Sequence, residues 1–86
     1  MNIYVLKTFT LKELYFGLAD GDVQAAVQKH KGDELSPVGH WRWESEEVKW
    51  GEVGSELHEA LAHSFISALR RQPPEEGWVI VFGGDN

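Results

Sequence analysis

The segment from Ser55 to Arg71 constrains the fold most, because it has the clearest helical periodicity in the chain. Its apolar residues recur at four-residue spacing and fall on one helix face: Leu57, Leu61, Phe65 and Leu69. Ser55 is a suitable N-cap, and Pro73-Pro74 prevents the helix from continuing. An amphipathic helix must bury its apolar stripe, so the remaining segments must supply the surface against which it packs.

Two strand-like segments, a shorter helix and a last strand supply that surface. Residues 3–6 and 14–18 are rich in β-branched, aromatic and aliphatic side chains, and they predict a hairpin. A short amphipathic helix begins at Asp20-Gly21-Asp22 and stops at Gly32, with an apolar stripe of Val23, Ala26, Val27 and His30. Residues 78–82 predict an apolar strand that is central in the sheet or well covered.

Residues 38–53 contain three of the four tryptophans and admit two structures. In the first, Trp41-Arg42-Trp43 lies in one strand, residues 45–47 turn, and residues 48–53 return with Trp50, which forms a Trp-rich hairpin. In the second, a single strand over residues 47–53 follows an irregular loop. The hairpin is the preferred interpretation.

The order of these elements predicts the fold class. It is β-β-α-β(-β)-α-β, which favours an α+β fold with two helices packed on one face of a small, mainly antiparallel sheet. A chain of 86 residues forms one domain, here residues 1–86. So short a chain leaves little room for a ligand pocket, which disfavours a small-molecule binder.

Charge and cysteine content exclude several classes of protein. The chain has 8 Lys and Arg against 14 Asp and Glu, a net charge of -6, which argues against a nucleic-acid partner. The absence of cysteine excludes disulfide scaffolds and thiolate metal sites. No apolar run approaches the roughly 20 residues that span a bilayer, and no targeting pattern is visible, so we expect a cytoplasmic protein without membrane contact.

The histidines are the obvious candidates for metal ligands or for catalysis. His58 and His63 are five residues apart, which places them some 140° apart around a helix, so they cannot chelate one ion. No nucleophile–base pair and no phosphate-binding loop is visible, so we predict no metal and no cofactor. His30 lies on an apolar stripe and has two open interpretations: a buried, hydrogen-bonded side chain or an acid–base group in a cleft.

Two short motifs and His30 carry a resemblance to a known family. Asn2-Ile3-Tyr4, Tyr15-Phe16-Gly17 and His30 on the following helix resemble the start of a GIY-YIG endonuclease domain. In that family two paired strands carry the motifs, the next helix carries an Arg and then a His or Tyr, and a later helix carries a metal-binding Glu. The resemblance implies a nuclease site at Tyr4, Tyr15 and His30.

The chain departs from the family at two positions. Ala26 stands where the resemblance places the catalytic Arg, and the metal-binding Glu falls near Ala62, with Glu59 as the nearest carboxylate. The Arg would stabilise negative charge on the phosphate, and the Glu would hold the metal ion. Their loss disfavours nuclease chemistry on this scaffold.

We therefore expect a non-catalytic binding or interaction module on a degenerate form of that scaffold. Its working surface would be the Trp hairpin and its acidic rim, with these binding residues: Trp41, Arg42, Trp43 and Trp50. Its partner would be a protein with a basic patch, or a second copy of the chain. The alternative is a divalent-metal-dependent nuclease that uses Tyr4, Tyr15, His30 and Glu59.

Overall fold

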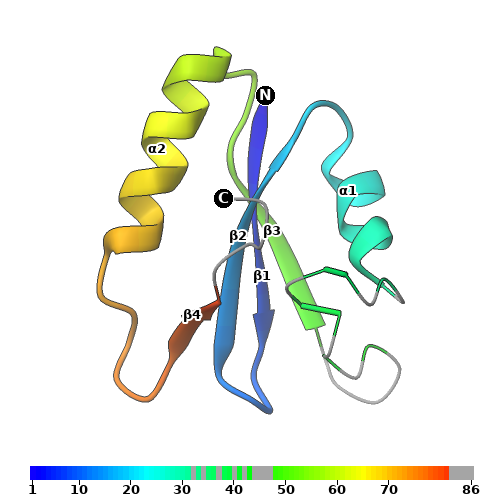
Figure 1. The fold of residues 1–86 in the computed structure, drawn as a ribbon, viewed down its shortest axis with the longest axis vertical. Coiled ribbons are helices and arrows are strands. Elements are labelled where there is room, and N and C mark those ends of the chain that lie inside the picture. Colours follow the sequence, from blue (N-terminus) through cyan, green and yellow to red (C-terminus); the bar gives the residue numbers. More distant parts are fainter. Residues whose placement is uncertain are drawn as a thin grey trace.

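The structure, a computed structural model, describes residues 1–31, 33, 35–36, 38–39, 41, 43 and 48–81. Its elements, in chain order, are β1 (Asn2–Thr8), β2 (Glu13–Ala19), α1 (Val23–His30), β3 (Val48–Gly54), α2 (Glu59–Arg71) and β4 (Val79–Val81). The sheet order is β3-β1-β2-β4 (Figure 1). β1 is antiparallel to β2 and β3, and β4 is parallel to β2. The predicted α+β class with a small sheet and two helices is confirmed.

The β1–β2 hairpin sets which side chains share a face of the sheet. Its register pairs Tyr4 with Gly17 and Leu6 with Tyr15 across the two strands. Because strand side chains alternate, Tyr4, Leu6 and Tyr15 lie on one face, and Ile3 lies on the other. Both faces are buried at this point, since Ile3 and Leu6 are fully inaccessible to solvent. The hairpin is therefore the centre of the fold.

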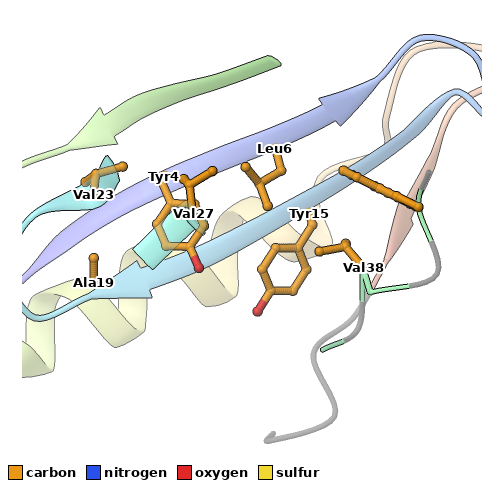
Figure 2. Close-up of a cluster of buried hydrophobic side chains, with 8 residues drawn as sticks. Tyr4, Leu6, Tyr15, Ala19, Val23, Val27 and Val38 are labelled. Atoms are coloured by element: carbon orange, nitrogen blue, oxygen red, sulfur yellow. The ribbon is translucent and has the colours of Figure 1, made fainter. Parts of the chain in front are cut away.

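The two helices lie on opposite faces of the sheet, which differs from the predicted arrangement on one face. Val23 and Val27 of α1 pack with Tyr4, Leu6 and Tyr15 in one hydrophobic cluster. Figure 2 shows α2 behind the strands, on the side away from that cluster. Since both faces of β1 carry large apolar residues, one helix alone would leave an apolar face in water. Strand alternation at Ile3 and Tyr4 already contained this information.

The start of α1 agrees with the sequence prediction. Asp22 is the N-cap, and its carboxylate accepts a hydrogen bond from the backbone N–H of Gln24 at 3.1 Å. This bond satisfies one of the N–H groups that the first turn leaves without a helical partner. Lys29 and His30 occupy the last turn, where a positive charge is favoured, and so the helix presents His30 near its C-terminal end.

The start of α2 differs from the prediction, because the helix begins at Glu59 with His58 as N-cap rather than at Ser55. Leu57 instead pairs with the start of the chain. Its N–H donates to the Met1 carbonyl at 2.8 Å, and its carbonyl accepts from the Met1 ammonium at 2.5 Å. These backbone bonds join the residue before β1 to the segment that follows β3. This pairing therefore outweighs the helix-start signal at Ser55.

Asn2 joins two connecting segments at the same end of the sheet, and its replacement by alanine is expected to destabilise the fold. Its Nδ2 donates to the Gly21 carbonyl at 2.7 Å, and its Oδ1 accepts from the Glu56 N–H at 2.9 Å. We expect Asn2→Ala to lower the free energy of unfolding by about 1–2 kcal/mol, since each bond contributes roughly 0.5–1.5 kcal/mol. Urea denaturation measures this loss. Asn2→Asp keeps the acceptor but places a carboxylate oxygen against the Gly21 carbonyl, so it should be no more stable than Asn2→Ala. An unchanged Asn2→Ala variant would contradict the contribution of these two bonds.

The last strand is short and lies at the edge of the sheet, whereas the sequence predicted a central or well-covered strand. β4 pairs only over Val79–Val81 with the first residues of β2, and the Val79 side chain is 58% exposed. Of the two other predicted residues, Trp78 precedes β4 and Phe82 lies outside the described residues. The apolar run thus reflects partial burial at an edge. No helix among the described residues is long and apolar enough to cross a bilayer.

Candidate binding site

A hollow near the predicted site residues lies beside α1 and the sheet. It has a volume of about 460 Å³ and is defined here as the α1 hollow. Its lining combines apolar, hydroxyl, imidazole and charged side chains: Tyr4, Tyr15, Leu18, Ala19, Asp20, Ala26, Lys29, His30, Asp33, Leu35 and Ser36. The sequence predicted that so short a chain leaves little room for a ligand pocket, whereas this hollow is large enough for a small ligand.

A hydrogen-bonded chain of three side chains forms part of the wall of the α1 hollow. The Tyr4 hydroxyl lies 2.6 Å from His30 Nε2, and His30 Nδ1 lies 2.5 Å from the Ser36 hydroxyl. The Ser36 oxygen also accepts from the backbone N–H of Val38 at 3.3 Å. In either neutral tautomer one imidazole nitrogen donates and the other accepts, so both are used. This chain holds His30 in one orientation.

Ring packing among Tyr4, Tyr15 and His30 also helps to fix the orientation of the His30 ring. The ring centres of Tyr15 and His30 are 5.2 Å apart at an interplanar angle of 71°. The Tyr4 ring lies 5.9 Å from the His30 ring and 6.4 Å from the Tyr15 ring. Edge and tilted contacts of this kind are the favoured ones between aromatic rings. Tyr4 and Tyr15 are nearly fully buried, and their hydroxyl ends point to the same side in Figure 2.

His30 combines the two interpretations that its sequence position left open. It is hydrogen-bonded and half-buried on the apolar side of α1, and it also lines an open hollow. Half-exposure and fixed ring nitrogens suit a group that contacts a ligand while its orientation is set by Tyr4 and Ser36.

Two of the tryptophans assigned to a binding surface belong to the packing of the fold. Trp41 is only 3% exposed, belongs to the cluster around Tyr4, and donates from Nε1 to the Glu13 carboxylate at 2.8 Å. Trp43 packs against the same cluster and donates from Nε1 to the Val38 carbonyl at 3.1 Å. Trp50 on β3 is 46% exposed. Arg42 lies outside the described residues.

The choice between a hairpin and a single strand is only partly decided by the described residues. β3 spans Val48–Gly54, close to the single-strand alternative over residues 47–53. Trp41 lies in a bend and Trp43 in a turn, so neither is in a strand. Residues 40, 42 and 44–47 lie outside the described part of the chain. The irregular-loop alternative therefore fits the two described tryptophans better.

Glu59 lies apart from Tyr4, Tyr15 and His30, with which the nuclease alternative combines it. It begins α2, on the opposite side of the sheet from the Tyr4 cluster, and its side chain is 79% exposed. Its Oε1 lies 3.9 Å from His63 Nε2. Ala26, the position of the missing Arg, does line the α1 hollow. Among the described residues, no three His, Asp or Glu side chains are grouped so that they could hold a metal ion.

The structure brings together Tyr4, Tyr15 and His30, which the sequence analysis had singled out, and places beside them three polar residues that it had not. Asp20, Asp33 and Ser36 also line the α1 hollow. Asp20 had been assigned to a helix start and Asp33 to a loop, and nothing in their sequence neighbourhood connects them to Tyr4. No local sequence signal marks Ser36, because its bond to His30 forms only once the residues after α1 are placed.

Comparisons of this chain with protein-family models, with curated proteins and with solved structures give no match.

Proposed function

We propose that the protein is a cytoplasmic, non-catalytic binding module that accepts a basic side chain of a partner protein in the α1 hollow. The observation that carries the proposal is the hollow itself, in which two carboxylates stand beside the fixed Tyr4–His30–Ser36 chain. Pockets that combine apolar walls with a few oriented polar groups are the usual form of a binding site.

Charge at the α1 hollow favours a cation over an anion. Asp20 and Asp33 line it, and the C-terminal end of α1 brings the negative end of the helix dipole to His30. Lys29 also lines the hollow and opposes this effect, but it is exposed and its long stem lets its ammonium group turn into solvent. The net charge of -6 adds long-range attraction for a basic partner.

The same geometry supports a scaffold like that of GIY-YIG domains. Tyr4, Tyr15 and His30 gather at one place, and Gly17 lies directly across from Tyr4. This gathering also favours the second candidate function, a divalent-metal-dependent nuclease. Against it stand Ala26 at the position of the Arg and Glu59 on the far side of the sheet. The binding function needs neither residue.

A peptide titration tests the proposal. We expect a short acetylated peptide with one central arginine to shift amide NMR signals around Asp20, His30 and Asp33, with a dissociation constant in the range of about 0.1–1 mM. The matched peptide with citrulline has nearly the same shape without the charge and should bind at least about threefold more weakly, since an exposed ion pair contributes roughly 0.2–1 kcal/mol.

The double variant Asp20→Asn/Asp33→Asn should weaken arginine-peptide binding by about three- to tenfold while leaving citrulline-peptide binding unchanged. Asparagine keeps the side-chain oxygen that Asp33 offers to the N–H of Leu35 at 3.0 Å. Glu76→Gln, an exposed charge away from the hollow, is the matched control. Equal binding of both peptides to wild type would contradict a cation site.

A cleavage assay separates the two candidate functions. The binding function predicts no Mg²⁺-dependent cleavage of a short DNA duplex at low salt. Cleavage that Tyr4→Phe and His30→Ala both abolish would establish the nuclease instead.

A further inference from the structure

A second hollow lies at the other end of the sheet, between the β1–β2 turn and the start of β4. It has a volume of about 160 Å³ and is defined here as the hairpin pocket, lined by Lys7, Phe9, Leu14, Glu75 and Trp78. Lys7 and Leu14 pair across β1 and β2 and alternate with the residues that face α1. The hairpin pocket therefore opens on the opposite face from the α1 hollow and shares no lining residue with it.

The walls of the hairpin pocket are aromatic and held by backbone bonds. The Phe9 and Trp78 rings meet edge to face with centres 5.3 Å apart. The Trp78 N–H donates to the Glu75 carbonyl at 2.9 Å, and the Val79 N–H donates to the Lys12 carbonyl at 3.0 Å. The first bond shapes the segment before β4, and the second ties that segment to the hairpin turn, which lies beside it at the lower end of Figure 1. The apolar part of the site is thus already formed.

Two side chains of opposite charge complete the lining. Lys7 and Glu75 are exposed, and neither side chain has a hydrogen-bond or ion-pair partner among the described residues. Lys7 also lies directly opposite Lys49 in the β1–β3 register. The positive charge of Lys7 would attract a carboxylate bound next to it. On a chain of net charge -6, this is an unusual place for an anion to be favoured.

We propose that the hairpin pocket binds a free α-amino acid with an apolar side chain, such as leucine. The carboxylate lies at Lys7, the ammonium group at Glu75, and the side chain against Phe9, Leu14 and Trp78. Only a zwitterion satisfies both charged residues together, and only an apolar side chain suits the walls. A volume of 160 Å³ accommodates a molecule of this size and excludes a nucleotide.

An NMR titration of the full chain with L-leucine tests the inference. We expect saturable shifts of the Trp78 indole N–H and of the amides of Lys7, Phe9 and Glu75, with a dissociation constant of about 1 mM for so small a ligand. Two analogues isolate the charges: 4-methylpentanoate lacks the ammonium group, and isopentylamine lacks the carboxylate. Each should bind at least about fivefold more weakly than leucine.

Variants assign the two contacts. Lys7→Met keeps most of the apolar stem and should weaken leucine at least about fivefold while leaving isopentylamine unchanged. Glu75→Gln should weaken leucine similarly while leaving 4-methylpentanoate unchanged. Both residues are exposed, so neither change should unfold the chain.

Absence of a saturable shift at tens of millimolar leucine would overturn the inference, as would equal binding of leucine and both analogues. Shifts centred on Tyr4 and His30 would overturn it too, because they place leucine in the α1 hollow. The inference does not depend on the proposed function. Asp20→Asn/Asp33→Asn should leave the leucine titration unchanged.

Discussion

Replacing Trp41 with alanine is expected to lower the free energy of unfolding by about 3–5 kcal/mol, the usual cost of truncating a buried tryptophan. The side chain is 3% exposed, packs in the cluster with Tyr4 and Tyr15, and donates to Glu13 at 2.8 Å. The total stability of an 86-residue domain is on the order of 4–13 kcal/mol. Guanidinium denaturation followed by circular dichroism should therefore show an unfolding midpoint at a much lower guanidinium concentration, or no native baseline at all.

Trp50→Ala is the matched control, because it removes the same side chain from a site that is 46% exposed. We expect it to cost about 1 kcal/mol or less, as for most surface substitutions. Equal losses for the two variants would contradict the burial of Trp41. A stable Trp41→Ala variant that fails to bind a partner would restore the interaction surface expected from the sequence.

The tryptophans illustrate why the sequence could not assign that surface. Alternation in Trp41-Arg42-Trp43 predicts that the two rings share a face, but it does not say whether the face is covered. In the structure their ring centres are 6.0 Å apart, and the face is covered because Val38 and Trp41 belong to the cluster around Tyr4 and Trp43 packs against it. That contact joins segments about thirty residues apart. Local patterns carry no information about such a pairing.

The β1–β2 hairpin and α1 were predictable because their signals are local. Tyr4 and Tyr15 lie on strands whose composition marks them, and His30 lies on a helix whose cap and periodicity mark it. That Tyr4, Tyr15 and His30 lie together was predicted only through the resemblance to GIY-YIG domains. The positions of α2 and β4 depend on long-range contacts. The pairing of Leu57 with Met1 delays the start of α2, and β4 pairs with β2 alone among the strands that the structure describes.

Gly17→Ala is expected to disturb the α1 hollow directly and to cost about 1–3 kcal/mol, the usual range for overpacking a filled site. A Cβ at this position would lie 2.3 Å from Cζ and 2.4 Å from the hydroxyl oxygen of Tyr4. The Tyr4 ring is buried and must move to admit the methyl group. Because that ring carries the hydroxyl bonded to His30, the movement separates the two groups.

Two measurements check this result. Urea denaturation gives the loss of stability, and the NMR signals of the His30 ring report whether its bond to Tyr4 persists. Gly21→Ala is the matched control, since a Cβ there meets no atom within 4 Å. It should leave stability within about 0.5 kcal/mol of wild type or raise it slightly by reducing the freedom of the unfolded chain. The arginine peptide should bind more weakly to Gly17→Ala and normally to Gly21→Ala.

A double variant separates a clash with Tyr4 from a general cost of alanine at position 17. Tyr4→Leu removes the far end of the ring, the part that the new methyl group would meet. The double variant Tyr4→Leu/Gly17→Ala should therefore lose less stability than the sum of the losses in the two single variants, by about 1–2 kcal/mol. Additive losses would mean that Tyr4 does not occupy the space above Gly17. The shape of the α1 hollow and the orientation of His30 both require the Tyr4 ring to lie over Gly17, because the missing side chain of this glycine leaves the space that the ring fills. The binding proposal therefore depends on this position of the ring.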